Sequence, residues 1–298
     1  MLRRDNLIFG KLKIMRKITF FLIFILFIFW PNFIYAQNLR IHFIDAGEGE
    51  AILIETPEHK NVLLDSGNLI TGLQVVKYLK NHNIYTLDHL IFTHPDLDHI
   101  GGAFFILQML KTKNIYDNGE DLTGLKKQSD IYRWYEDLVR RDKNYKAIKA
   151  QDSISLGNLT LRVLWPLRSF LSGDYNANSL VIMMEYGKFR CLLTADLTFL
   201  GEREILKTKE DLKADVLKIA HHGASDANSE EFLTRVSAKI AIISVDKRNI
   251  RGYPNEGLLE RLKKDRVKLY RTDEDGDVTI DICQSKHGDF KIRVNKTR

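Results

Sequence analysis

The 298-residue chain has few cysteines and no apolar run long enough for an ordinary membrane span. Its longest uninterrupted apolar run covers eleven residues, 20–30, whereas a membrane-spanning helix needs about 20. The two cysteines, Cys191 and Cys283, lie far apart in the sequence and are a weak signal for a disulfide, although an oxidising compartment would allow them to pair. We therefore expect Cys191 to be a small buried residue of a strand.

The chain also lacks an internal repeat, a low-complexity linker and a large charge excess outside its N-terminal segment. Its formal net charge is +6, but residues 1–36 contain six basic residues and one acidic residue, a net +5, so the remainder carries only +1. A near-neutral remainder is no strong signature of a polyanion-binding surface. A hydrophobic content of 44% allows a substantial core, and we expect one domain in residues 37–298.

Residues 1–36 have the layout of a secretory signal. Arg16 and Lys17 precede the apolar run, and the small residue Ala36 ends the segment before Gln37. We expect either a cleaved signal peptide, 1–36, or an uncleaved membrane anchor formed by residues 18–36. Both alternatives export the globular part to the periplasm or the cell exterior, and both limit membrane contact to the N-terminal segment.

The order of apolar segments predicts an α/β fold. Alternation and turn residues predict strands at 39–45, 51–56, 61–65, 88–93, 153–156, 160–165, 179–185, 189–194, 215–220, 239–245, 267–270 and 278–283. Helical patterns cover 73–79, 103–110, a segment from about 200, a segment near 230, and 255–264. Residues 111–150 are charged, lack strand alternation and space Ile131, Trp134 and Leu138 as a helix does, so they predict a helical insertion. Two mixed sheets with helices outside them, a four-layer αββα sandwich, accommodate this order.

The chain does contain a dense cluster of metal-capable side chains directly after an apolar, strand-like run. His94, Asp96, Asp98 and His99 occur within six residues, on a loop where their side chains can converge. Imidazoles and carboxylates together suit zinc, manganese or iron. The alternative is a helix start, in which Asp96 or Asp98 caps a helix beginning near Gly101 and the histidines lie at the surface.

Three other predicted strands also end in metal-capable residues. Asp65 follows one strand, Asp196 follows a second, and the pair His221-His222 follows a third. Asp65 could belong to a plain turn and Asp196 could cap a helix, but adjacent imidazoles after an apolar strand have no obvious packing purpose. Acidic and imidazole groups at several strand exits indicate one shared site at the edge of a sheet.

These motifs occur in an order that resembles the metallo-β-lactamase superfamily and, within it, the soluble hydrolase domain of ComEC-type competence proteins. The resemblance runs from about Arg40 to Ile280 and is weakest over 111–150. It rests on the following motifs: Asp45-Ala-Gly-Glu-Gly-Glu-Ala-Ile-Leu-Ile, Leu64-Asp65-Ser66-Gly67, Thr93-His94-Pro-Asp96-Leu-Asp98-His99-Ile-Gly-Gly, Asn178-Ser179-Leu-Val, Leu193-Thr-Ala-Asp196-Leu, His221-His222-Gly and Tyr270-Arg-Thr-Asp-Glu-Asp-Gly276.

The resemblance implies a site for one or two divalent metal ions. One ion is held by His94 and Asp96 and the second by Asp98 and His99. Asp196 bridges the two ions, and either His221 or His222 completes the site.

The chain departs from the superfamily's pattern at two places. The superfamily more often has histidine at Asp96, and its additional histidine before the 179–185 strand is absent, with Asn176 and Asn178 in that region. Fewer imidazoles and more oxygens favour manganese or a labile zinc site.

The resemblance also implies roles in a hydrolytic reaction. Ions of this kind lower the pKa of a bound water toward about 7. Asp98 is then expected to orient or deprotonate that water, and the histidine of the 221–222 pair that is not a ligand, His222 in one assignment, to contact a phosphate oxygen. Asp65 would hold the loop of residues 94–99, the metal loop, by hydrogen bonds, supported by Asn178 and Ser179.

The function that follows is an exported metal-dependent phosphodiesterase, most simply a nuclease, because the ComEC-type domains are associated with degradation of a DNA strand. DNA or another phosphodiester is the expected partner, and the oligomeric state is not predicted. One alternative is a hydrolase of small esters, lactones or β-lactams on the same fold. A second alternative is a secreted binding protein whose site has decayed.

Overall fold

A computed structural model describes residues 38–126, 130–167, 170–171, 173–284 and 289–298, and residues Asn38–Arg298 form one compact unit. The expected signal peptide or anchor, 1–36, lies outside these residues. In the part of the chain that is described, no helix is both long and apolar enough to cross a membrane.

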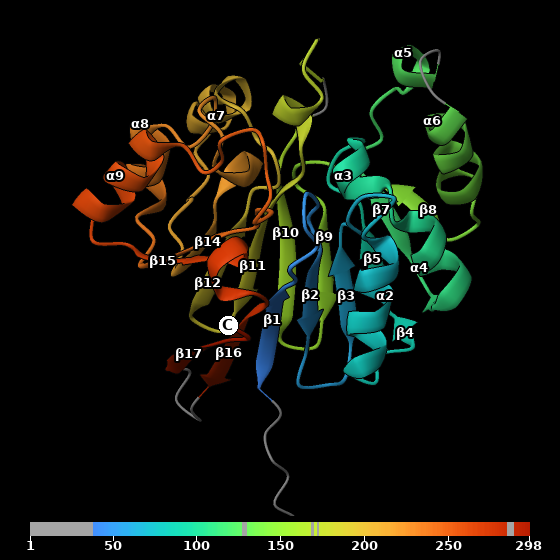
Figure 1. The fold of residues 1–298 in the computed structure, drawn as a ribbon, viewed down its shortest axis with the longest axis horizontal. Coiled ribbons are helices and arrows are strands. Elements are labelled where there is room, and N and C mark those ends of the chain that lie inside the picture. The colour runs from blue at the N-terminus through green and yellow to red at the C-terminus, as the bar shows by residue number, and fades with distance from the viewer. Residues whose placement is uncertain (1–37, 127–129, 168–169, 172, 285–288) are drawn as a thin grey trace, which may run out of the picture. The chain divides into compact units, whose positions relative to one another are not determined.

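The first sheet is mixed and is built mainly from the N-terminal half of the chain (Figure 1). Its strand order is β17-β16-β1-β2-β3-β5-β7-β8 within the described residues. The strands from β17 to β3 are antiparallel neighbours, whereas β3, β5, β7 and β8 run parallel. Their bounds are β1 Leu39–Phe43, β2 Ile52–Glu55, β3 Asn61–Leu64, β5 His89–Ile91, β7 Ile115–Asp117, β8 Tyr145–Ala147, β16 Val278–Gln284 and β17 Phe290–Lys296.

The second sheet has the order β15-β14-β13-β12-β11-β10-β9 within the described residues. Strands β9 to β12 are antiparallel, and β12 to β15 are parallel. Their bounds are β9 Ser153–Leu156, β10 Leu159–Trp165, β11 Val181–Tyr186, β12 Phe189–Leu193, β13 Val216–Lys218, β14 Ile240–Ile243 and β15 Lys268–Arg271. A small parallel pair joins β4, Thr86–Leu87, to β6, Lys111–Thr112.

Helices cover the outer faces of the two sheets, which gives the four layers expected from the sequence. Figure 1 shows α2 and α4 beside the first sheet and α7, α8 and α9 beside the second. One hydrophobic cluster lies between the sheets. A second lies between the first sheet and its helices, and a third between the second sheet and its helices. The main helices are α2 Gly72–Asn81, α4 Ala103–Met109, α7 Phe199–Leu206, α8 Glu230–Val236 and α9 Glu256–Lys264, with short helices α3 Leu97–Ile100, α5 Thr123–Lys126, α6 Asp130–Tyr135 and α10 Thr272–Asp275.

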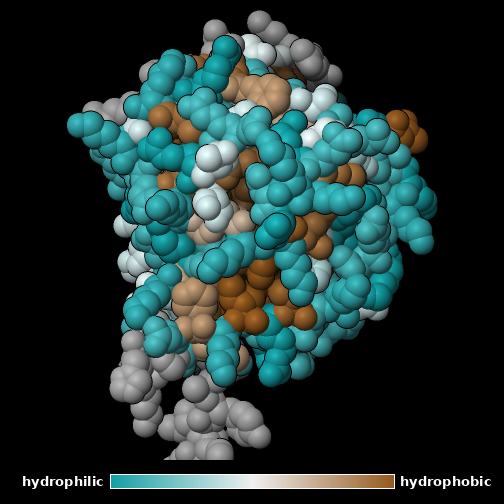
Figure 2. Space-filling model, turned by 90° about the vertical axis from the view of Figure 1, so that its left-hand side faces the viewer, coloured by the Kyte–Doolittle hydropathy of each residue, from teal (hydrophilic) through white to brown (hydrophobic). Residues whose placement is uncertain are grey.

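The outer helices are amphipathic, as their sequence spacing requires. Helix α9 buries Leu258 and Leu262, one turn apart, and exposes Glu260 and Lys263. Figure 2 shows the side that carries α8, α9 and the edge strands β15 and β17, where hydrophilic side chains cover most of the surface and a hydrophobic area remains in the lower half.

The segment 111–150 is not a purely helical insertion, contrary to the prediction for it. It contains α5, α6 and a π-helical turn, Glu136–Arg140, but also β6, β7 and β8, and the last two extend the first sheet in parallel. These strands are at most three residues long, too short for alternation to be visible in the sequence. Trp134 does lie on α6 as its spacing indicated.

Both cysteines are free in the structure. Cys191 is fully buried in β12, which confirms its predicted place in a strand, and Cys283 is partly buried in β16. The two residues do not form a disulfide, so the sandwich is stabilised by its three hydrophobic clusters instead.

One glycine after the metal loop is required by close packing. Gly102 donates its backbone N–H to Gly67 O at 3.0 Å. A Cβ at Gly102 would overlap the carbonyl oxygen of Ser66 and approach the Cα of Gly72 to 2.8 Å. All of these partners are backbone atoms, which cannot rotate out of the way.

We predict that Gly102→Ala lowers the free energy of unfolding by about 2–3 kcal/mol, because the added methyl group overpacks a backbone contact. Denaturant titration followed by circular dichroism measures this change. The control is Gly124→Ala, where the nearest atom to the new Cβ is 3.5 Å away. An unchanged midpoint for Gly102→Ala would contradict this account.

Candidate metal centre

The metal loop leaves the end of β5 and runs into the short helix α3. Asp96 is the N-cap residue of α3, but its side chain makes no capping hydrogen bond, and Asp98 lies inside the helix. Capping therefore does not explain these two carboxylates. Asp96 instead directs Oδ2 to within 3.8 Å of His94 Nε2.

The chain leaves β3, β12 and β13 on strained backbone, and Asp65 after β3 has φ 58°. Ala195, after β12, has φ 45°, and His221 and His222, after β13, have φ 50° and 52°. Non-glycine residues rarely adopt positive φ, and such outliers cluster at functional sites. The N-cap residue of α7 is Thr198, so Asp196 does not cap the helix that follows it.

Donor atoms from the three segments converge on the carboxylate of Asp196. Its Oδ2 lies 3.3 Å from His99 Nε2 and 3.4 Å from His222 Nε2. Asp98 Oδ2 also lies 3.4 Å from His222 Nε2. The donor atoms of Asp98, His99, Asp196 and His222 all lie within 4.8 Å of one another, which is a geometry that can hold a metal ion.

His94 also lies close to Asp196 and to His99. His94 Nε2 is 3.9 Å from Asp196 Oδ2, and the His94 and His99 rings are 4.1 Å apart. Asp196 Oδ2 thus lies near the Nε2 atoms of three imidazoles, those of His94, His99 and His222. That Asp196 bridges two ions stays a prediction.

The residues fit a cation because their buried donor atoms have no other partner. Among the described residues, His94 Nε2, His99 Nε2, His222 Nε2 and Asp196 Oδ1 are buried without a hydrogen bond. Each such atom costs about 1–3 kcal/mol if it stays unsatisfied. Four of them directed at one point are explained by divalent cations bound among them.

A single carboxylate fixes two of these imidazoles through their Nδ1 atoms, on the side away from the donor cluster. Asp65, fully buried at the end of β3, accepts hydrogen bonds from Thr93 N at 2.8 Å and His99 Nδ1 at 2.7 Å. The Thr93 hydroxyl donates to Asp65 Oδ2 at 2.8 Å and accepts from His94 Nδ1 at 3.1 Å. Both rings therefore keep the Nε2 lone pair toward the centre, which is how ligand tautomers are commonly fixed.

The structure separates the two adjacent histidines. His222 donates Nδ1–H to Ser244 O at 2.8 Å and turns Nε2 into the donor cluster. His221 lies outside the four-residue cluster, pairs Nδ1 with Asp226 Oδ1 at 2.9 Å and places Nε2 3.3 Å from Asn176 Nδ2. His222 is thus the member of the pair that is positioned as a ligand.

The surroundings of the centre shift the pKa values of its imidazoles in opposite directions. Burial, with the charge of His99, lowers the pKa of His94 to about 3, so His94 is neutral. Burial disfavours charge on His222 as well, but Asp196 and Asp98 outweigh it and raise the pKa of His222 to about 10. The same carboxylate, Asp196, with Asp65, raises the pKa of His99 against the effect of burial. A proton and a metal cation therefore compete for His99 and His222.

A buried ion pair lies behind the metal loop. Lys218 of β13 is fully buried, pairs with the carboxylate of Glu50 and donates to Ile219 O at 3.0 Å. Glu50 in turn donates its backbone N–H to Asp98 O at 3.1 Å. This pair links the two sheets beside the ligands. The ion pair was not predicted from the sequence, although a lysine within an apolar strand is a recognisable signal.

Asn178 and Ser179, expected to support the ligands, lie just before β11, where Asn178 ends a 3-10 turn, Asn176–Asn178. Asn178 donates to Glu120 Oε1 at 2.6 Å and to Leu171 O at 2.9 Å, which organises a neighbouring loop. The Ser179 hydroxyl is buried without a partner among the described residues. No hydrogen bond within that part of the chain joins either side chain to a metal ligand.

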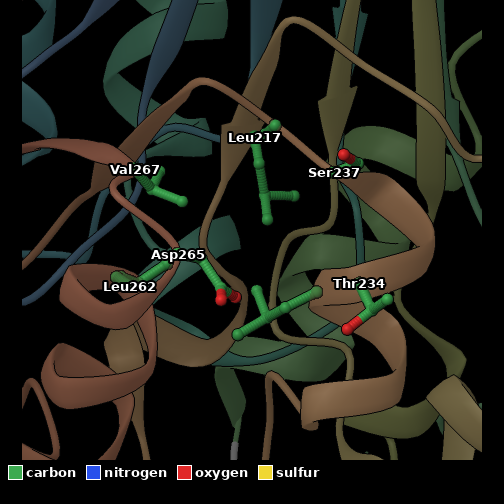
Figure 3. A pocket seen from close by; sticks show the side chains of 8 residues that line it. Leu217, Thr234, Ser237, Leu262, Asp265 and Val267 are labelled. Atoms are coloured by element: carbon green, nitrogen blue, oxygen red, sulfur yellow. The ribbon is translucent and has the colours of Figure 1, made fainter.

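A separate pocket lies between α8 and α9, away from the metal ligands. Figure 3 shows Asp265 and the hydroxyls of Thr234 and Ser237 around it, with Leu217 and Leu262. Its lining includes residues that precede β14 and β15, whereas the ligands follow the carboxyl ends of β5, β12 and β13. The pocket contains no imidazole and has no connection to the chemistry of the centre.

Comparison with protein families identifies the architecture. Residues 44–246 match the family model described as the metallo-beta-lactamase superfamily. The metallo-beta-lactamase fold protein YhfI from Bacillus subtilis superposes with a TM-score of 0.51 and 13% identity, over 79% of this chain and 96% of that one. The structural match shows the fold alone.

Two curated relatives have similar sequences. ComE operon protein 3 of Bacillus subtilis (strain 168) is 30% identical over 256 residues, which make up 80% of this chain and 32% of that protein. Recombination protein 2 of Haemophilus influenzae is 30% identical over 253 residues, 83% of this chain and 29% of that protein. The chain thus spans about a third of the length of these relatives.

We predict that Asp65→Asn lowers divalent metal affinity by about 10- to 100-fold, because the amide cannot accept all the hydrogen bonds that orient His94 and His99. Competition titration against a coloured chelator measures the affinity. Asp211→Asn is the control, since Asp211 pairs with Arg190 at the surface. Equal affinity for Asp65→Asn and the parent would remove Asp65 from this role.

We also predict that metal binding releases protons and strengthens as the pH rises from about 6 to about 9. His222, with a pKa raised to about 10, is protonated across this range, and a metal ion must replace that proton. Calorimetric titration in buffers of different ionisation enthalpy measures the release. Affinity independent of pH would contradict the assigned charges.

Proposed function

The chain belongs to the metallo-beta-lactamase superfamily, and on this premise we propose that it is an exported metal-dependent hydrolase of phosphodiester bonds that acts as a nuclease. The observation that carries the proposal is the convergence of unpartnered imidazole and carboxylate atoms around Asp196. A binding protein with a decayed site would have no reason to keep four buried donors unsatisfied.

One or two manganese or zinc ions fit this donor set. His94 and Asp96 would hold one ion, Asp98, His99 and His222 the other, and Asp196 both. Ions of this kind supply positive charge for the substrate's oxygens and lower the pKa of a water molecule. Three carboxylates among these six residues favour manganese or a labile zinc.

The chain's own residues would position the reactants. The side chains of Asp96 and Asp98 are 36% and 24% exposed, so the substrate can approach on their side. Burial disfavours the charged form of Asp98, but the neighbouring His222 and His99 lower its pKa overall, so Asp98 is ionised and able to accept a hydrogen bond from the attacking water. His221 is oriented by Asp226, and its Nε2 would exchange the 3.3 Å contact with Asn176 Nδ2 for one to a phosphate oxygen.

A nucleic-acid substrate is supported by the relatives and by the site rather than by net charge. The relatives include Recombination protein 2 and Competence protein ComA of Neisseria gonorrhoeae, whose names refer to recombination and competence. The oxygen-rich donor set suits ions that bind phosphate. The export proposal rests on the basic and apolar layout of residues 1–36, and the proposed partner is single-stranded or duplex DNA.

We predict that the purified protein cleaves DNA and bis-p-nitrophenyl phosphate when manganese or zinc is present. Asp98→Asn should lower kcat by about 100-fold or more, because it removes a ligand and the group that orients water. Asp211→Asn is the control and should retain activity. Gel and colorimetric assays across a series of divalent ions make the measurement.

The same assays separate the alternatives. Turnover of a chromogenic β-lactam or lactone without cleavage of phosphodiesters would overturn the nuclease proposal in favour of a hydrolase of small esters, lactones or β-lactams. Absence of stoichiometric metal in the purified protein, and of any activity after metal addition, would overturn the enzyme proposal in favour of a binding protein.

A further inference from the structure

A pocket opens directly beside the metal ligands and is closed on its far side by the loop that follows β14. Asp98 and His222 line it from the centre, and Asn249, Arg251 and Tyr253 line it from the loop. A substrate that is held at the ligands and extends toward this loop therefore contacts these side chains.

The loop is held in shape by one amide side chain. Asn249 Oδ1 accepts a hydrogen bond from Tyr253 N at 2.9 Å, and Asn249 Nδ2 donates to Tyr253 O at 3.0 Å. The same Nδ2 donates to Asp246 O at 2.9 Å. These bonds close residues 246–253 into a compact turn, so the groups that it presents to the pocket are positioned before any substrate binds.

Arg251 is the cation of this pocket. It lines the pocket beside Glu48, Asp98 and Tyr253. No carboxylate of the described residues forms an ion pair with it. Asp246, the other acid of the pocket, pairs with Arg248 at 3.9 Å and accepts from Arg248 N at 2.8 Å. Arg251 thus keeps free donors on a preformed loop next to the metal ligands.

Tyr253 connects this arginine to the rest of the site. Its ring lies 5.9 Å from the ring of His221, centroid to centroid, and Tyr253 lines the same pocket as Arg251. A planar guanidinium presents parallel N–H donors, which match two oxygens of a phosphate group.

We propose that Arg251 is the substrate-binding residue that recognises the phosphate group, with Tyr253 as its positioning residue. Arg251 donates to the non-bridging oxygens of the phosphodiester whose phosphorus lies at the metal ligands. This inference rests on the proposed phosphodiesterase function and adds the residues that select an anionic phosphoryl group.

The test measures binding of inorganic phosphate to the metal-loaded full chain by calorimetry, together with kcat and KM on bis-p-nitrophenyl phosphate. Arg251→Met should weaken phosphate binding and raise KM by about 10- to 100-fold, as expected for loss of hydrogen bonds to a charged group. Arg251→Lys should recover part of the loss, and Tyr253→Phe should weaken binding several-fold, by less than Arg251→Met. Metal content should stay unchanged in all three variants.

Arg248→Met is the matched control, since it removes the same charge from the same loop at a side chain that is 90% exposed. Equal phosphate affinity for Arg251→Met and the parent, or an equal loss for Arg248→Met, would overturn the inference. If phosphate binding depends on Arg251 but no phosphodiester is cleaved, the proposed function fails while the binding site stands. If cleavage occurs and Arg251→Met matches the parent, the function stands and this inference fails.

Discussion

One buried carboxylate, Asp65, holds the metal loop to the first sheet. It accepts hydrogen bonds from the Thr93 backbone, the Thr93 hydroxyl and His99, and through Thr93 it also orients His94. A carboxylate buried among three donors is satisfied, whereas the same group without them would be costly. The direction of two ligand rings therefore depends on a residue that touches no other part of the centre.

The remaining ligands come from the second sheet, so the site exists only where the two sheets meet. Asp196 and His222 follow β12 and β13, while His94 and His99 follow β5. The buried pair of Lys218 and Glu50 joins the sheets at this place. Because three carboxylates and several imidazoles share a buried volume, their charges perturb one another, and this is the electrostatic signature of a site prepared for cations.

Much of the fold could be read from the sequence because long strands and amphipathic helices leave periodic patterns. The alternation in β10, where Leu159, Leu161 and Val163 point into the inter-sheet core, is an example. Strands β7 and β8 were missed because three residues carry too little periodicity, and their charged neighbours hid them. The roles of Thr93 and Asp226 could not be predicted for a different reason. They depend on hydrogen bonds to a neighbouring loop or side chain, which leave no pattern in the sequence.

The sequence by itself determined which side chains were available and that they stood at strand exits, since residue type and apolar periodicity are local properties. The tertiary structure decided which of them meet. His221 and His222 are neighbours in the chain, but backbone strain and different acceptors, Asp226 and Ser244 O, send their rings in different directions. Likewise, Arg251 lies far from Asp98 in the sequence and reaches the same pocket only because the chain after β14 returns to the edge where the ligands lie. Distances between residues that are remote in sequence are set by packing of the two sheets, and no local pattern encodes them.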